Sequence, residues 1–121
     1  MARDRRVAER SGRAAETFAA FFLRLKGYSL VERRYRTPVG EIDLIMRRGG
    51  TLAFVEVKRR ASRDEALLSV APAARRRILR AAEWYISSHP AAAGLTCRFD
   101  VVALAPRRLP YHLVDAFGVD R

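Results

Sequence analysis

The apolar residues between positions 10 and 26 recur at the three- and four-residue spacing of an α-helix, and Gly27 follows them as a stop signal. Around such a helix, Arg13 falls on a polar stripe that faces solvent, whereas Glu16 falls among small and apolar residues. We therefore predict a first helix over residues 10–26 that carries one carboxylate on a mostly apolar face. The apolar positions that define the helix are Ala14, Phe18, Phe21, Phe22 and Leu25.

Two alternating segments, 41–46 and 51–58, follow an extended segment at 28–36 and predict a β-hairpin. Gly49 and Gly50 tolerate positive φ and suit a two-residue turn, which places Arg48 opposite Thr51. In this register one face of the hairpin is wholly apolar, and we predict it to be the core side because a one-residue slip would mix the faces. The apolar face consists of Ile42, Leu44, Met46, Ala53, Val55 and Val57.

On the opposite face, the same register places Asp43 across from Glu56 and Glu41 across from Lys58. Facing carboxylates destabilise a hairpin, and burial makes this worse, unless a proton or a cation lies between them. A divalent cation would resolve the conflict, because a few hard oxygen ligands with open positions suit Mg²⁺ or Mn²⁺. Lys58 could then reach a scissile phosphate or activate a water molecule. The alternative is a structural face on which Lys58 bridges Glu41 and Asp43 while Glu56 points to solvent.

A second helix is predicted over residues 72–88, because Pro72 suits its first turn and Pro90 ends it. Its inward positions are Ile78, Ala82, Tyr85 and Ile86. The outward face combines basic side chains with an aromatic ring, which suits phosphate neutralisation and base stacking. These outward residues are Arg76, Arg77, Arg80 and Trp84. The alternative is a solvated basic face on which Trp84 packs against a neighbouring element or a second subunit.

Residues 96–104 predict a further strand, and residues 111–117 a short closing strand or coil. We interpret Asp100 as the partner of an arginine that holds the sheet together, and we leave it outside the catalytic set. Cys97 is the only cysteine, which excludes an internal disulfide or a cysteine-built zinc site and favours a small core residue. His89 and His112 are isolated, which is typical of surface or edge residues.

The charge of the chain indicates a class of partner. A length of 121 residues suits a single domain spanning 1–121, and 24 Lys and Arg residues against 13 Asp and Glu residues give a net charge of +11. Such a field favours polyanions, most simply nucleic acid, with an acidic membrane surface as the weaker candidate. No apolar segment approaches membrane-spanning length and the first ten residues are highly charged, so we predict a cytoplasmic protein without a membrane anchor or secretory signal.

Five segments resemble, in order along the chain, the YraN-like family of small bacterial proteins described as predicted endonucleases. They are GRAAE (12–16), KGY (26–28), RTPVGEIDLI (36–45), FVEVKRR (54–60) and CRFDVV (97–102). Asp43, followed on the next strand by Glu56-Val57-Lys58, also resembles the motif of the PD-(D/E)XK nuclease superfamily, although the motif proline is absent before Asp43. A further departure is Arg34, which stands where the family tends to have Asn.

The resemblance implies a restriction-endonuclease-like α/β core, with a mixed central β-sheet flanked by helices, related to archaeal Holliday-junction resolvases. It also implies roles for individual residues. Asp43, Glu56 and the main-chain carbonyl of Val57 would bind the metal. Lys58 would be the catalytic lysine, and Glu16 the helix-borne acid that some resolvase-like members add.

These patterns together predict a Mg²⁺- or Mn²⁺-dependent DNA endonuclease that hydrolyses phosphodiester bonds in a branch, flap or junction. Two symmetric cuts in a junction would need two sites, so we expect a homodimer. Two alternatives remain, a non-catalytic nucleic-acid-binding module and an interaction subunit for an acidic protein. The facing carboxylates favour the enzyme, because a remnant could replace them with Thr or Val and gain stability. The residues predicted to bind nucleic acid are Arg13, Arg76, Arg77, Arg80 and Trp84.

Overall fold

The computed structural model describes the backbone of residues 2–118 and the side chains from residue 12 onward. The helices of this part are α1 (Ala2–Leu25), α2 (Arg63–Leu68) and α3 (Pro72–Ser88), followed by a 3₁₀ turn, η1 (Pro90–Gly94). The strands are β1 (Ser29–Thr37), β2 (Gly40–Arg48), β3 (Thr51–Arg59), β4 (Thr96–Leu104) and β5 (Tyr111–Phe117). None of the described helices is long and apolar enough to cross a membrane.

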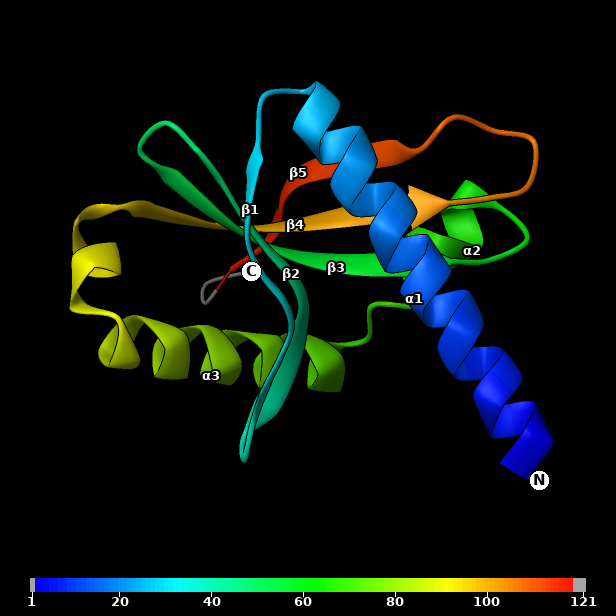
Figure 1. Ribbon diagram of the computed structural model, residues 1–121, viewed down its shortest axis with the longest axis horizontal. Helices are drawn as coiled ribbons and strands as arrows, with labels where there is room; N and C mark the ends of the chain where they lie inside the picture. The colour runs from blue at the N-terminus through cyan, green and yellow to red at the C-terminus, as the bar shows by residue number, and fades with distance from the viewer. Residues whose placement is uncertain (1, 119–121) are drawn as a thin grey trace.

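The strands form one five-stranded sheet in the order β1-β2-β3-β4-β5. Neighbouring strands are antiparallel except β3 and β4, which are parallel. Parallel neighbours need a long crossover connection, and here the segment with α2, α3 and η1 supplies it. As Figure 1 shows, α1 crosses one face of the sheet while α3 runs along the other. The predicted mixed central sheet flanked by helices is therefore confirmed, and it is compatible with a restriction-endonuclease-like core.

The hairpin register is confirmed for the half of β2 and β3 nearest the turn. Arg48 pairs with Thr51, Leu44 pairs with Val55, and Gly49 adopts a φ of 58° in the turn. The backbone pairing ends at Leu44 and Val55. Beyond this point β2 bends away from β3 and continues beside β1 (Figure 1). Asp43 and Glu56 thus lie where the two strands separate, not within a continuous ladder.

The prediction of a single core side for the hairpin is wrong, because both faces of the sheet are buried. Leu44, Met46, Ala53 and Val55 pack towards α1. The opposite face carries its own apolar cluster beneath α3, which includes Ile42, Ile45, Leu52 and Phe54. The crossover between β3 and β4 places α3 over the face that the sequence suggested was open. The carboxylates therefore occupy the end of the strands rather than an exposed sheet face.

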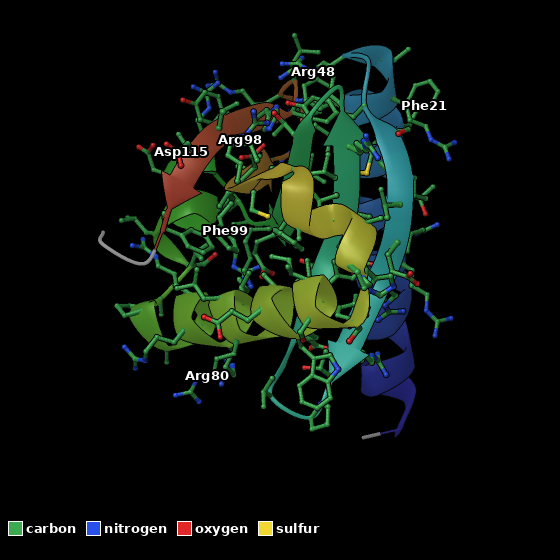
Figure 2. The ribbon with its side chains drawn as sticks, turned by 90° about the vertical axis from the view of Figure 1, so that its left-hand side faces the viewer. Phe21, Arg48, Arg80, Arg98, Phe99 and Asp115 are labelled. Carbon is green, nitrogen blue, oxygen red and sulfur yellow. The ribbon has the colours of Figure 1, made fainter. Side chains whose placement is uncertain are left out.

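The helix α1 begins before the predicted residue 10 and buries a different stripe from the one that revealed it. Phe18, Phe21 and Leu25 are 53%, 60% and 73% exposed, and Figure 2 shows Phe21 pointing away from the sheet. The buried stripe consists of Ala15, Glu16, Ala19, Ala20 and Leu23. Its small side chains allow the helix backbone to approach the sheet closely and still pack without voids.

The structure adds one helix to the predicted elements and corrects the placement of Cys97. The segment between β3 and α3 contains the helix α2, whose first turn is capped because the Ser62 hydroxyl accepts a hydrogen bond from the Glu65 backbone N–H at 3.1 Å. Cys97 is exposed near the start of β4 and is not a core residue. The inward face predicted for α3 is confirmed, with Ile78, Ala82 and Tyr85 buried.

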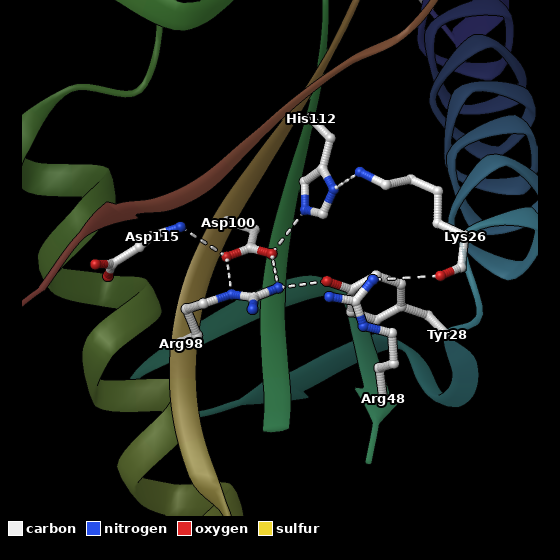
Figure 3. A network of polar contacts seen from close by, with 7 residues as sticks. All are labelled: Lys26, Tyr28, Arg48, Arg98, Asp100, His112 and Asp115. Carbon is white, nitrogen blue, oxygen red and sulfur yellow. Dashed lines mark hydrogen bonds and ion pairs between the residues drawn. The ribbon is translucent and has the colours of Figure 1, made fainter. Parts of the chain in front are cut away.

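Asp100 lies at the centre of a buried polar network on the α1 face of the sheet (Figure 3). Arg98 donates two hydrogen bonds to it, at 2.9 and 2.8 Å, which confirms the predicted arginine partner. His112 Nε2 donates a third at 2.7 Å, so the prediction of an isolated histidine is wrong. Burial alone would raise the pKa of Asp100, but these hydrogen bonds and the Asp115 backbone N–H lower it to about 2. The network is a satisfied structural cluster.

Candidate metal centre

The two predicted carboxylates meet where β2 and β3 separate. Asp43 Oδ2 accepts a hydrogen bond from the backbone N–H of Val57 at 2.8 Å. The Asp43 side chain thus pairs with the Val57 N–H at a point where the backbone of β2 no longer pairs with β3. This bond fixes the Asp43 carboxylate against β3, beside Glu56.

Glu56 has a strongly perturbed acidity. Burial is the largest cause, and the hydrogen bond and negative charge of Asp43 add to it, raising the pKa of Glu56 to about 8. Lys58 acts in the opposite direction, with its Nζ 3.5 Å from Glu56 Oε1. At neutral pH the metal-free pair therefore holds a proton. Either a proton or a cation can relieve the repulsion between these carboxylates, as predicted from the sequence, and here the proton does so.

Glu16 brings a third carboxylate from α1. The residue is only 7% exposed, and its Oε1 has no hydrogen-bond partner. Burial and the charge of Asp43 raise the pKa of Glu16, while Arg34 and Arg33 act to lower it. The Arg34 Nε lies 3.4 Å from Glu16 Oε1, an ion pair without a hydrogen bond. A buried carboxylate oxygen left in this state is suited to a cation or to the water around one.

Arg34 has an unusual backbone conformation beside this carboxylate. Its φ is 51°, in the left-handed region that Asn adopts more readily than most other residues with a side chain. This conformation would suit the Asn that the family resemblance suggests at this position. In this chain the arginine instead places a guanidinium group beside Glu16.

A hollow of about 650 Å³ opens over the three carboxylates from the α1 side, and we call it the carboxylate hollow. The residues that line it are Gly12, Ala15, Glu16, Glu41, Asp43, Glu56, Val57, Lys58, Arg59, Arg60, Ala61 and Pro106. A smaller hollow of about 130 Å³ reaches Asp43 and Glu56 from the α3 side, where Arg77 contributes to its wall. The carboxylate pair is thus accessible from both layers of helices.

The arrangement of charges differs from the salt-bridged alternative that the sequence left open. In that alternative Lys58 bridges Glu41 and Asp43, but the ion pair of Lys58 in the structure is with Glu56. The side chain of Glu41 is 67% exposed and pairs with Arg36 at 3.5 Å. Glu56 is not directed to solvent, since its side chain is only 13% exposed.

The residues predicted to bind nucleic acid are all exposed but do not form one surface with the carboxylates. Arg77 reaches the α3-side hollow. The first residue of β2 lies close against this part of α3, because a Cβ added to Gly40 would lie 2.2 Å from the Arg77 carbonyl oxygen. Arg76, Arg80 and Trp84 line neither hollow, and Figure 2 shows Arg80 pointing away from the body of the molecule.

The prediction missed two arginines that do line the carboxylate hollow, Arg59 and Arg60. They follow Lys58 directly in the FVEVKRR segment, so their position at the end of β3 was a usable signal. Arg13 is exposed on α1, one residue from Gly12 at the edge of the same hollow.

The donor set fits a hydrated hard cation. Among the described residues no group of three or more His, Cys, Asp or Glu side chains is arranged to hold a metal ion by itself. Mg²⁺ instead keeps several waters and is held by one or two carboxylates together with substrate phosphate. Asp43 and Glu56 supply such a pair, and Glu16 lines the same hollow.

The fold and the site define a mixed α/β protein with a carboxylate cluster at the end of its central strands. Residues 15–104 match the uncharacterised protein family UPF0102, and the chain belongs to this family, which bears out the YraN-like resemblance. A UPF0102 protein of Methylocella silvestris is 53% identical over 117 residues, which cover 97% of this chain and 94% of that relative. The UPF0102 protein Atu0303 of Agrobacterium fabrum is 50% identical over 113 residues, covering 93% of each chain.

Proposed function

We propose that this chain is a metal-dependent DNA endonuclease of the PD-(D/E)XK type. The observation that carries the proposal is the carboxylate pair of Asp43 and Glu56, held together at the cost of a strongly raised pKa. A pair that only supported the fold would gain stability from losing one charge. Strongly perturbed acids in a hollow are typical of functional sites.

Asp43, Glu56 and the main-chain carbonyl of Val57 would hold Mg²⁺ or Mn²⁺, and Glu16 would accept hydrogen bonds from the coordinated water. When bound, the cation supplies charge stabilisation to a phosphoryl oxygen and lowers the pKa of a water molecule. Glu56 must release its proton for this role, so its raised pKa links metal binding to pH.

Lys58 is placed to act on the scissile phosphate itself. Its side chain is 23% exposed, lines the carboxylate hollow and is oriented by the ion pair with Glu56 at 3.5 Å. From this position the ammonium group would orient the attacking water or stabilise the charge that develops on the phosphate. Arg59 and Arg60 on the same wall would neutralise adjacent phosphates, and the net charge of +11 would attract the polyanion.

The substrate we propose is branched DNA, such as a flap or a junction. A four-way junction requires two symmetric cuts, and each chain has one carboxylate cluster in its described part, so such a reaction would need two copies of the chain. Arg76, Arg80 and Trp84 on the outer side of α3 would then bind a DNA arm away from the cut.

The test is cleavage of labelled linear duplex, single-stranded, flap and four-way-junction DNA with Mg²⁺ or Mn²⁺. Asp43→Asn and Lys58→Ala are compared with the parent and with Glu65→Gln, a control at an exposed position on α2. We expect metal-dependent cutting that both site variants lose and the control retains. Binding of DNA without any cutting would instead favour a non-catalytic nucleic-acid-binding module. The absence of both binding and cutting would reject a nucleic-acid function.

A further inference from the structure

The carboxylate hollow does not end at the metal centre but continues along α1 into a second hollow of about 250 Å³. The two share three lining residues, Ala15, Arg59 and Pro106, so they lie side by side, and we refer to them together as the groove. The far part, which we call the Phe18 hollow, is lined by Ala14, Ala15, Phe18, Arg59, Leu104, Ala105, Pro106 and Arg108. A groove therefore leads from the proposed cutting site to an exposed aromatic ring.

The side chains of the Phe18 hollow match the chemistry of an unpaired nucleotide strand. Phe18 is 53% exposed, and the exposed guanidinium-bearing residues Arg59 and Arg108 line the same hollow. Proteins that bind single strands combine a basic groove, which follows the phosphates, with aromatic rings on which bases stack. The interior bases of a continuous duplex have no free face to offer such a ring, because neighbouring bases cover both of their faces.

We propose that this groove binds a single-stranded segment next to the scissile phosphate, with a base stacked on Phe18 and its phosphates between Arg59 and Arg108. That the bound strand lies next to the scissile phosphate rests on the proposed nuclease function. The binding of a single strand in the groove does not. The substrate class that follows is DNA with an unpaired segment, such as a flap or a splayed end, in preference to continuous duplex.

A second copy of the chain is the competing occupant, because Phe18 belongs to an exposed apolar stripe that also includes Phe21 and Leu25. A dimer contact along α1 would use all three side chains. A bound strand would depend on Phe18 alone, since Phe21 and Leu25 do not line the groove. This difference separates the two occupants experimentally.

The experiment measures binding of labelled oligonucleotides by fluorescence anisotropy in EDTA, so that its result is independent of metal and cleavage. The probes are a single strand, a flap and a blunt duplex, and one base of the single strand is replaced by 2-aminopurine to report stacking. For Phe18→Ala we expect weaker binding of the single strand and the flap by about fivefold or more, with duplex binding unchanged. Phe18→Trp should restore both the affinity and the quenching of 2-aminopurine.

Two controls complete the design. Phe21→Ala removes an equally exposed ring from the same helix but outside the groove, and it should leave single-strand binding unchanged. Arg108→Ala should reduce the slope of log affinity against log salt by about 0.7 for single strands. The control Arg24→Ala removes an exposed arginine on α1 that lies outside the groove, and it should leave the slope unchanged.

Three outcomes would overturn the inference. The first is equal loss of binding in Phe18→Ala and Phe21→Ala. The second is a parent protein that binds blunt duplex as tightly as the flap. The third is a concentration-dependent dimer that both Phe variants dissociate, which would assign the stripe to a second copy. If the groove binds strands as expected but no metal-dependent cutting occurs, the strand site stands and the nuclease proposal fails.

Discussion

Replacing Glu56 by Gln removes the ionisable group at the centre of the carboxylate pair and keeps the size of the side chain. In the folded protein the pKa of Glu56 is about 8, compared with an ordinary value of 4.5. Between these two pH values the folded chain binds more protons than the unfolded chain, so the free energy of unfolding falls as the pH rises. The stability that protonated Glu56 contributes is complete below pH 4.5 and is lost as the pH passes through 8.

The size of the effect follows from the same pKa. At about 1.4 kcal/mol per pH unit, the displacement from 4.5 to about 8 sets a ceiling of about 5 kcal/mol. Local rearrangement and water entry around the ionised group reduce this value, so we expect about 2 to 4 kcal/mol. Glu56→Gln should therefore match the parent near pH 5 and exceed it by this amount near pH 9.

The assay is urea unfolding at several pH values in EDTA, followed by circular dichroism. Glu65→Gln is the matched control, because it makes the same change at an exposed position on α2. The difference between Glu56→Gln and the parent should grow with pH, and the difference for the control should not. Parallel pH profiles for Glu56→Gln and the parent would refute the assignment of a buried, protonated carboxyl group to this position.

Three further changes test the site and its support. Asp43→Asn should weaken Mg²⁺ binding in calorimetry yet preserve or raise stability in EDTA, because the amide oxygen can still accept the backbone hydrogen bond without the negative charge. Clear destabilisation in EDTA would instead indicate a structural ion pair. Gly40→Ala should cost about 2 kcal/mol or more in urea unfolding, because its Cβ would lie 2.2 Å from the Arg77 carbonyl oxygen, and an unchanged midpoint would show that this contact relaxes freely. Asp100→Asn should cost about 3 to 5 kcal/mol because it leaves the Arg98 charge poorly compensated, and a near-neutral effect would contradict the role of the network.

The elements that the sequence predicted well depend on local patterns. Gly49-Gly50 between two alternating segments fixes a tight hairpin, and the observed pairing of Arg48 with Thr51 follows from that turn. The outward arginines of α3 are equally local, because helical spacing alone separates them from Ile78 and Tyr85. Asp43 and Glu56 could be brought together in advance because they lie on adjacent strands joined by a short turn.

The predictions that failed depend on contacts between distant segments. His112 lies twelve residues from Asp100 on the neighbouring antiparallel strand, and the sequence alone does not fix the register of these two strands across their long connection. The hydrogen bond follows from the pairing of β5 with β4, whose register shifts at Asp100. Residues such as Arg108 and Phe18 are far apart in the chain and share a hollow only because α1 lies across the ends of β3 and β4.

The sequence by itself determined a basic α/β chain with a hairpin, a carboxylate pair, an adjacent lysine and membership of a family, because these follow from composition, periodicity and neighbouring positions. The tertiary structure alone decided which stripe of α1 is buried. The aromatic stripe is the more hydrophobic of the two, but the small residues let the helix approach the sheet closely. That choice places Glu16 beside Asp43 and leaves Phe18 exposed at the end of the groove. Burial is a property of how whole elements pack, and a single segment does not encode it.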